Sequence, residues 1–154
     1  MGVRDKDRGA ILFHLAFPVT DFTETKHFYL TGLGGRLGRE SAHALVVQLG
    51  GHQLVAHLSD IPSLQQGIYP RHFGLIFKTR RAWQAMADRV CVRHISFYQA
   101  PRVRFPGTRL EHATFFLEDP SGNLLEFKHY KYRSAIFGER LATEIGDTAS
   151  TVSK

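Results

Sequence analysis

Hydrophobic and polar positions alternate in two stretches of the chain, and the two stretches read as one strand written twice. They are residues 13–19, Phe-His-Leu-Ala-Phe-Pro-Val, and residues 71–77, Arg-His-Phe-Gly-Leu-Ile-Phe. Successive side chains of a strand point to opposite faces, so each copy gathers its large apolar residues on one face and turns a histidine to the other. These histidines are His14 and His72. The repeat predicts a chain built from two related halves.

Helix and turn signals follow the first strand. Asp21 can cap a helix, with Glu24 at the third position of a capping box. We expect this helix to pass through Leu30 and to end at the glycine cluster that begins at Gly32. Further strands are predicted over 36–39, 42–49 and 52–58, the last two joined at the hairpin signal Gly50-Gly51.

The second half repeats this order. Trp83, Met86, Ala87 and Val90 recur at helical spacing and predict a helix over 79–90. Strands are predicted over 95–99, 112–118 and 123–130, with a Pro-Gly turn at 119–122 between the last two. The stretch 102–109 is expected to be a loop that helps to decide the substrate.

The predicted fold is therefore α+β, with two βαβββ modules over about 11–60 and 70–132 in one domain that spans 11–132. Residues 1–10 are expected to form a flexible lead. Residues 133–154 are expected to form a C-terminal extension that is partly disordered, because the apolar pattern fades there and the last residues are small and polar.

Composition narrows the function. The 154 residues are 43% hydrophobic, without an apolar run long enough to span a bilayer and without a secretory signal at the charged N-terminus, which predicts a soluble cytoplasmic protein. Cys91 is the only cysteine, so any metal must use nitrogen and oxygen ligands. The formal net charge of +6 is spread along the chain, which argues against a nucleic-acid reader and leaves a preference for anionic ligands open.

Strand parity brings candidate ligands to one face. If Leu125 and Phe127 pack on a helix, Glu126 points to the opposite side, away from the helix like His14 and His72. Two imidazoles and one carboxylate form a metal-binding set. The small residues Ala16 and Gly74 beside the histidines are expected to leave room for a metal and a substrate. His57 is expected to point into the same cavity.

These residues resemble the vicinal oxygen chelate superfamily, which includes glyoxalase I, type I extradiol dioxygenases, and the bleomycin and fosfomycin resistance proteins. The resemblance covers about residues 11–132. It rests on the two histidine strands, on the doubled element order, and on the stretch Glu-Asp-Pro-Ser-Gly-Asn-Leu-Leu-Glu-Phe, residues 118–127. It implies paired βαβββ modules that form a curved mixed sheet around a metal, and it implies a homodimer that binds a small-molecule substrate.

The resemblance is closest to the extradiol dioxygenases, and this implies His14, His72 and Glu126 as ligands of Fe(II) or Mn(II). Glyoxalase I uses a fourth ligand, a carboxylate, where this chain has Val55. A glyoxalase-like lyase or isomerase with Zn or Ni remains an alternative. A metal-free protein that binds an antibiotic is a third reading.

The resemblance also implies roles for further residues around the metal. His57 resembles the acid/base histidine of the family, His112 is a candidate hydrogen-bond donor beside the ligands, and Tyr130 is a candidate substrate contact. A purely structural role stays open for His57 and His112, since a histidine that faces a cavity also hydrogen-bonds neighbouring strands. Whether the modules pair within one chain or exchange between two chains also stays open.

Overall fold

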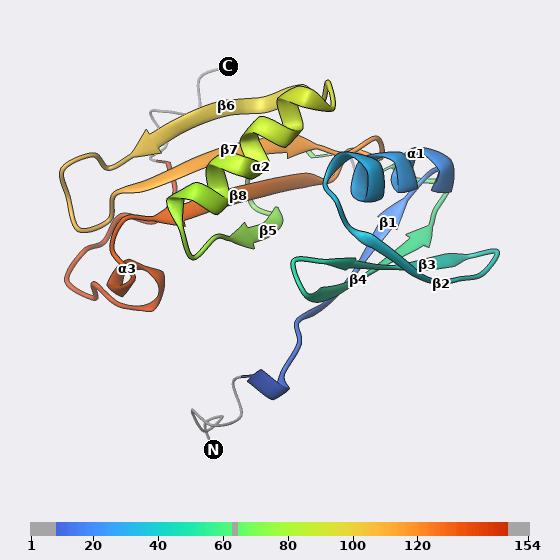
Figure 1. Ribbon diagram of the computed structural model, residues 1–154, viewed down its shortest axis with the longest axis horizontal. Helices are drawn as coiled ribbons and strands as arrows, with labels where there is room; N and C mark the ends of the chain where they lie inside the picture. Colours follow the sequence, from blue (N-terminus) through green and yellow to red (C-terminus); the bar gives the residue numbers. More distant parts are fainter. Residues whose placement is uncertain (1–8, 63–64, 148–154) are drawn as a thin grey trace.

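The structure is a computed structural model that describes residues 9–62 and 65–147. Its strands form two four-stranded sheets with the orders β1-β4-β3-β2 and β5-β8-β7-β6 (Figure 1). Most of the predicted N-terminal lead, and the end of the predicted C-terminal extension from residue 148, lie outside the described residues.

The first module contains β1 (His14–Val19), α1 (Phe22–Lys26), the π-helical turn η2 (His27–Gly32), β2 (Arg36–Glu40), β3 (Ala44–Leu49) and β4 (His52–Leu58). Asp21 Oδ1 accepts the backbone N–H of Glu24 at 2.8 Å, which confirms the predicted helix start. Gly50 and Gly51 have φ values of 58° and 84°, the left-handed pair that a tight hairpin requires. The predicted hairpin is thus confirmed.

The second module contains β5 (Phe73–Ile76), α2 (Arg80–Val92), β6 (Phe97–Arg104), β7 (His112–Glu118) and β8 (Leu124–Tyr130), and α3 (Ser134–Phe137) follows it. Thr79 caps α2 by accepting the N–H of Ala82 at 3.1 Å. In both modules the first strand pairs in parallel with the last, and the last strand pairs antiparallel with the strand before it. The α+β fold of two βαβββ modules is therefore confirmed.

Strand β6 corrects the prediction for this part of the chain. The expected strand 95–99 begins at Phe97 and continues to Arg104, and only the residues that follow form a loop. Pro101 interrupts the apolar alternation, but β6 is an edge strand, where a residue without an N–H is tolerated. Arg102 and Arg104 pair with Thr114 and His112 of β7, so both arginines stand on a strand.

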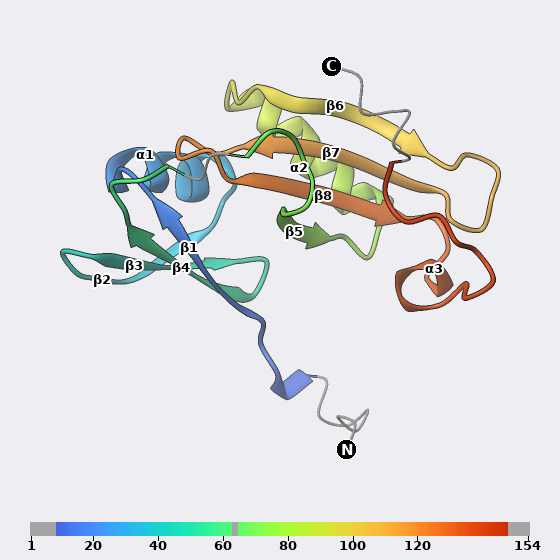
Figure 2. The same ribbon diagram turned by 180° about the vertical axis from the view of Figure 1, so that it is seen from behind.

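One hydrophobic core contains residues of helix α2 and of both modules. Helix α2 covers one face of the second sheet (Figures 1 and 2), and Trp83 donates its indole N–H to the carbonyl of Phe127 at 2.9 Å. Phe17 of the first module and Phe73 of the second have ring centroids 5.4 Å apart. The buried Tyr29 hydroxyl donates to Asp119 Oδ2 at 2.8 Å, again between modules. Because α2 occupies one face of the second sheet, the other face is left for a site.

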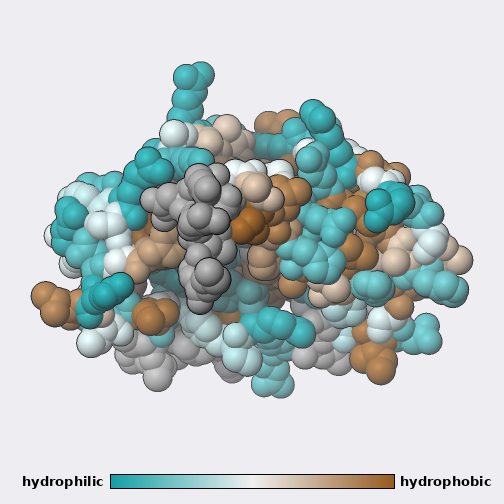
Figure 3. All heavy atoms as spheres, turned by 90° about the horizontal axis from the view of Figure 1, so that it is seen from below, coloured by the Kyte–Doolittle hydropathy of each residue, from teal (hydrophilic) through white to brown (hydrophobic). Residues whose placement is uncertain are grey.

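The surface offers no membrane-spanning element among the described residues, since none of their helices is long and apolar enough to cross a bilayer. The face shown in Figure 3 mixes hydrophobic and hydrophilic residues. After α3 the chain runs back across β8 and β7 on the face away from α2, as the red segment of Figure 2 shows. This segment covers the place where charged side chains gather.

Candidate functional site

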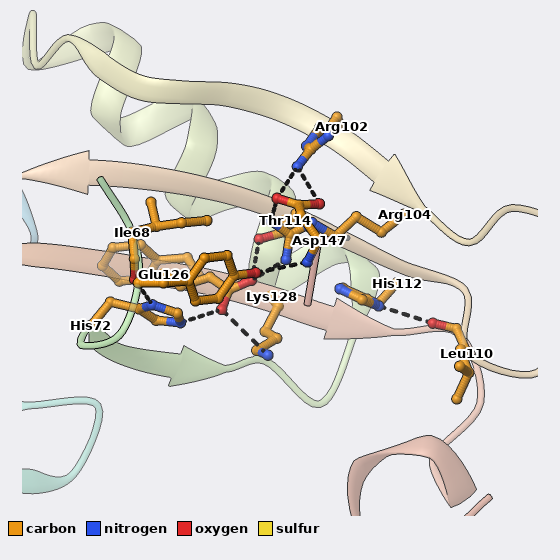
Figure 4. Close-up of polar contacts among 12 residues, drawn as sticks. Ile68, His72, Arg102, Arg104, Leu110, His112, Thr114, Glu126, Lys128 and Asp147 are labelled. Atoms are coloured by element: carbon orange, nitrogen blue, oxygen red, sulfur yellow. Dashed lines mark hydrogen bonds and ion pairs between the residues drawn. The ribbon is translucent and has the colours of Figure 1, made fainter. Parts of the chain in front are cut away.

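A pocket of about 460 Å³ lies on the open face of the second sheet, beneath the segment that follows α3. Strands β6, β7 and β8 supply its floor, and the turn before β5 supplies one wall (Figure 4). The polar side chains that line it include Tyr69, His72, Arg104, His112, Glu126, Lys128 and Tyr130. Four of the six residues predicted for the site are therefore brought together here.

Glu126 is the centre of the polar network and is only 3% exposed. Its Oε1 accepts the Thr114 hydroxyl at 2.7 Å and lies 3.5 Å from Arg104 Nη1, while its Oε2 lies 3.3 Å from Lys128 Nζ. Burial by itself raises the pKa of Glu126, but the hydrogen bond with His72, the charge of Lys128 and the hydrogen bond from Thr114 together lower the pKa to about 2. The carboxylate is thus charged at any physiological pH.

Gly74 of β5 pairs with Glu126 and explains how β8 comes so close. A Cβ atom at this position would collide with the backbone carbonyl oxygen of Glu126. The space beside Gly74 is therefore filled by the backbone of β8, which differs from the expectation that a small residue there leaves room for a metal and a substrate.

His72 faces Glu126 across the pocket wall. Its Nδ1 donates to the carbonyl of Ile68 at 2.6 Å, and its Nε2 lies 3.0 Å from Glu126 Oε2. In the neutral ring this leaves a lone pair on Nε2 directed at a carboxylate oxygen, so a cation must lie between the two atoms. In the absence of metal that cation is a proton, and the hydrogen bond with Glu126 accordingly raises the pKa of His72.

His112 and Arg104 pair across β7 and β6, and each is 6% exposed. His112 Nδ1 donates to the carbonyl of Leu110 at 2.9 Å, and burial above all lowers the pKa of His112, so the ring is neutral with a lone pair on Nε2. Neither His112 Nε2 nor Arg104 Nε has a hydrogen-bond partner among the described residues. The pocket thus offers a buried acceptor and a buried donor, whereas the sequence indicated a donor at His112.

Tyr130 completes this side of the pocket. Its ring centroid lies 4.9 Å from that of His112, and its hydroxyl lies 3.4 Å from Lys128 Nζ. Tyr130 therefore orients the imidazole and the ammonium group, and it presents an aromatic wall to whatever enters the pocket.

The other two predicted site residues lie in the first sheet. His14 is exposed and its Nδ1 contacts Gln53 Oε1 at 2.7 Å, and His57 is exposed on β4. Residues 9–62 and 65–147 contain no cluster of three histidine, cysteine, aspartate or glutamate side chains that could hold a metal ion. Within one chain, His72 and Glu126 therefore converge without His14.

Sequence reasoning missed Arg104, Thr114 and Asp147. Arg104 and Thr114 share the pocket face with His112 and Glu126 through the strand register, which the assignment of 102–109 to a loop concealed. Asp147 falls in the extension expected to be partly disordered, and its carboxylate instead pairs with Arg102 and Arg104. The local sequence gives no signal for such a distant contact.

A comparison with models of known protein families shows the family of this chain. The profile described as the Glyoxalase/Bleomycin resistance protein/Dioxygenase superfamily matches residues 11–127. The chain belongs to this superfamily. The match confirms the resemblance to the vicinal oxygen chelate proteins and spans both modules.

Solved structures agree with this membership. A glyoxalase/bleomycin resistance protein/dioxygenase from Alicyclobacillus acidocaldarius is 41% identical, with a TM-score of 0.79 over 82% of this chain and 96% of that one. The fosfomycin resistance protein FosX from Mesorhizobium loti is 16% identical, with a TM-score of 0.62 over 86% and 98% of the two chains.

Lactoylglutathione lyase from Agrobacterium tumefaciens is 14% identical, with a TM-score of 0.59 over 78% of this chain and 93% of that one. At this level of identity the lyase and the resistance protein share the fold alone. A search of curated proteins finds no match. The superfamily contains enzymes and resistance proteins, so the function must be argued from the site.

Proposed function

We propose that this protein is a metal-dependent enzyme of the extradiol dioxygenase kind, which acts on a substrate chelated through two vicinal oxygens. His72, Glu126 and a His14 from a second copy of the chain are the proposed ligands. The observation that carries the proposal is the 3.0 Å approach of His72 Nε2 to Glu126 Oε2, where two lone pairs require a shared cation. A divalent metal can replace the proton that these atoms share.

The surroundings of the two ligands favour a metal. The carbonyl of Ile68 holds the other ring nitrogen of His72, and the Thr114 hydroxyl holds Glu126, which is how proteins orient metal ligands. Lys128 Nζ lies 3.3 Å from Glu126 Oε2 and pairs with the oxygen that a metal ion would bind. Lys128 would therefore have to move its ammonium group away when the metal binds. Its side chain is 25% exposed and flexible, so this movement is feasible.

The position of His14 favours a homodimer. His14 is exposed at the start of β1, directly after Ile11, Leu12 and Phe13, whose exposed fractions are 53%, 66% and 57%. A run of exposed apolar residues is typical of a protein interface, and a two-fold dimer would deliver two equivalent His14 side chains. His57 shares a sheet face with His14, so the copy that brings His14 brings His57 to the same side.

The strand register supports a three-ligand site. Ala16 pairs with Val55 in the first module as Gly74 pairs with Glu126 in the second, so valine occupies the position of the second carboxylate. Two histidines and one carboxylate leave open positions for a bidentate substrate and for dioxygen. This favours the dioxygenase reading over a four-ligand, glyoxalase-like lyase.

The pocket residues have defined tasks in this proposal. Bound Fe(II) or Mn(II) would supply Lewis-acid polarisation of the vicinal oxygens and redox capacity toward dioxygen. His112 Nε2, neutral and without a partner among the described residues, accepts a proton from a substrate hydroxyl. Arg104 Nε donates to a substrate oxygen, and Tyr130 holds the His112 ring. His112 thereby takes the base role that the sequence assigned to His57.

Metal content tests the proposal. The full chain, purified without added metal and then reconstituted with Fe(II), Mn(II), Zn or Ni, is analysed by mass spectrometry. We expect close to one ion of iron or manganese per chain, lost in His72→Ala and Glu126→Gln and retained in His43→Ala, which changes an exposed histidine of the first module. A chain that holds no metal under any of these conditions would point to the metal-free binding protein instead.

Mixed dimers test the origin of His14. His14→Ala and His72→Ala chains carrying different tags are co-expressed, and the dimer that contains both is isolated. If His14 comes from the partner, one of the two sites in this mixed dimer is intact and binds metal, although neither variant alone does. If the ligands belong to one chain, the mixed dimer binds no metal.

Turnover distinguishes the enzyme classes. Oxygen uptake with a panel of catechols by the iron- or manganese-loaded protein would support the dioxygenase assignment. Hemithioacetal turnover with zinc or nickel, without oxygen uptake, would replace it with the lyase alternative.

A further inference from the structure

The proposed chemistry does not use the carboxylate of Asp147, which lies against the pocket at the end of the described chain. Arg102 Nη2 donates to both oxygens of this carboxylate at 2.9 Å, and Arg104 Nη2 donates to Oδ2 at 2.7 Å. Figure 4 shows the three side chains gathered over β6 and β7. A carboxylate from the chain itself thus occupies a position built from two arginines.

Arg104 connects this position with the proposed metal ligands. The same guanidinium lies 3.5 Å from Glu126 Oε1 through Nη1 and 2.7 Å from Asp147 Oδ2 through Nη2. An anion in the place of Asp147 is therefore one guanidinium group away from Glu126. Arg104 is 6% exposed, yet its Nε has no partner among the described residues, although buried polar groups are normally satisfied. A ligand that spans the pocket would supply the missing acceptor.

The segment that carries Asp147 is weakly held. Residues 138–147 form no helix or strand, and the large apolar side chains of Leu141 and Ile145 in this segment have exposed fractions of 94% or more. Beyond the arginine contacts of its side chain, Asp147 is held by the bond from its backbone N–H to Tyr69 Oη at 2.8 Å. A segment that buries so little apolar surface can detach at small cost.

We propose that the substrate of this pocket carries a carboxylate that binds Arg102 and Arg104 in place of Asp147, and that Asp147 is an internal competitor for that position. This inference rests on the proposed function for the site and adds the substrate class. A carboxylate matches the observed contacts, in which Arg102 Nη2 donates to both oxygens of Asp147 and Arg104 Nη2 donates to one of them. When Asp147 leaves, the cations Arg102, Arg104 and Lys128 keep Glu126 as the one carboxylate among these contacts, and the excess of positive charge attracts an anion.

The experiment uses the metal-free full chain, so that it is independent of the metal proposal. Salicylate is the probe, and salicylamide is its neutral control of nearly the same shape. Binding is measured by calorimetry in the wild type and in Asp147→Asn, which keeps the shape of the side chain and removes its charge. We expect Asp147→Asn to bind salicylate about tenfold more tightly, the scale of one charge-assisted hydrogen bond, with no gain for salicylamide.

Two arginine variants and one NMR resonance test whether the arginines bind the carboxylate of salicylate. Arg104→Lys keeps the charge but loses the planar fork and should lose the salicylate gain when combined with Asp147→Asn. Arg36→Gln changes an exposed arginine of β2, in the other sheet, and should behave as wild type. In NMR spectra of the wild-type chain, the Nε–H resonance of Arg104 should shift when salicylate is added and should not shift when salicylamide is added.

The outcomes separate the two proposals. Equal salicylate affinity in wild type and Asp147→Asn, or an equal gain for salicylate and salicylamide, would overturn the carboxylate assignment whatever the metal analysis shows. If the salicylate results are as expected but the chain takes up no metal on reconstitution, the anion position is kept and the metal-dependent chemistry is rejected.

Discussion

The two modules share strand order and register but not chemistry. The last strand of each module shows the difference. One face of β4 carries Gln53, Val55 and His57, and the matching positions of β8 carry Leu124, Glu126 and Lys128. The first set lies on a sheet face that is largely open to solvent, whereas Glu126 lies 3% exposed beneath the C-terminal segment. One backbone plan thus carries a site in only one of its copies.

The difference in burial explains why the second module is the specialised one. Three of the six residues of β3 are buried, whereas six of the seven residues of β7, its counterpart beside the last strand of the second module, are buried. Charged groups interact more strongly away from water, and burial makes an unpaired one costly. The network around Glu126 therefore depends on all its members, whereas His14 and His57 are exposed to solvent.

Replacing Glu126 by the valine found at the matching position of the first module should have the largest effect on stability. Glu126→Val gives the second module the side chain of the first, removes the carboxylate that His72, Lys128 and the buried Arg104 share, and abolishes metal binding. We expect the free energy of unfolding to fall by about 3 kcal/mol in urea denaturation. Val55→Glu, on the partly exposed face of the first module, should cost less than about 1 kcal/mol. Equal costs would mean that the two faces are equivalent.

Histidines of the two modules should differ in turnover. Once a substrate is found, His112→Asn should lower kcat by about a hundredfold, because the pocket loses its free buried acceptor. His57→Asn should lower kcat by less than about tenfold, since His57 lies exposed on β4 of the first sheet and does not line this pocket. Steady-state kinetics of both variants at equal metal content make the comparison, and the reverse order would return the base role to His57.

Gly74 and Ala16 occupy matching positions and should respond differently to substitution. Gly74→Ala places a methyl group against the carbonyl oxygen of Glu126, and we expect a loss of about 2 kcal/mol of stability together with weaker metal binding. Ala16→Gly, in the exposed counterpart, should cost under about 1 kcal/mol through backbone entropy. Thermal unfolding of the two variants is the measurement, and a stable Gly74→Ala chain would contradict the close strand approach.

The smallest effect concerns the pH dependence of the metal-free chain. The hydrogen bond with Glu126 raises the pKa of His72 in the folded state, so its protonation stabilises the fold below the unfolded pKa near 6.5. This contribution is lost as the pH rises through the folded pKa. Stability should decline modestly above pH 6.5 in the wild type and in His14→Gln, and His72→Gln should remove that part of the decline.

Local patterns in the sequence determined the elements and their doubling. The caps at Asp21 and Thr79, the Gly50-Gly51 turn and the alternation in the strands all act within a few residues, so they can be interpreted without knowing the fold. The same locality made Glu126 recognisable, since it lies in the characteristic stretch 118–127, and His72 stood out because it repeats the position of His14.

Only the tertiary structure decided which of these residues meet. The register of β6 on β7 aligns Arg104 with His112, and the close approach of β5 to β8 requires Gly74. The return of the chain after α3 sets Asp147 on two arginines, and no histidine, cysteine, aspartate or glutamate of the described residues joins His72 and Glu126 in a three-residue metal cluster. These relations depend on pairing and packing between residues distant in the sequence, and periodicity within one strand carries no information about them.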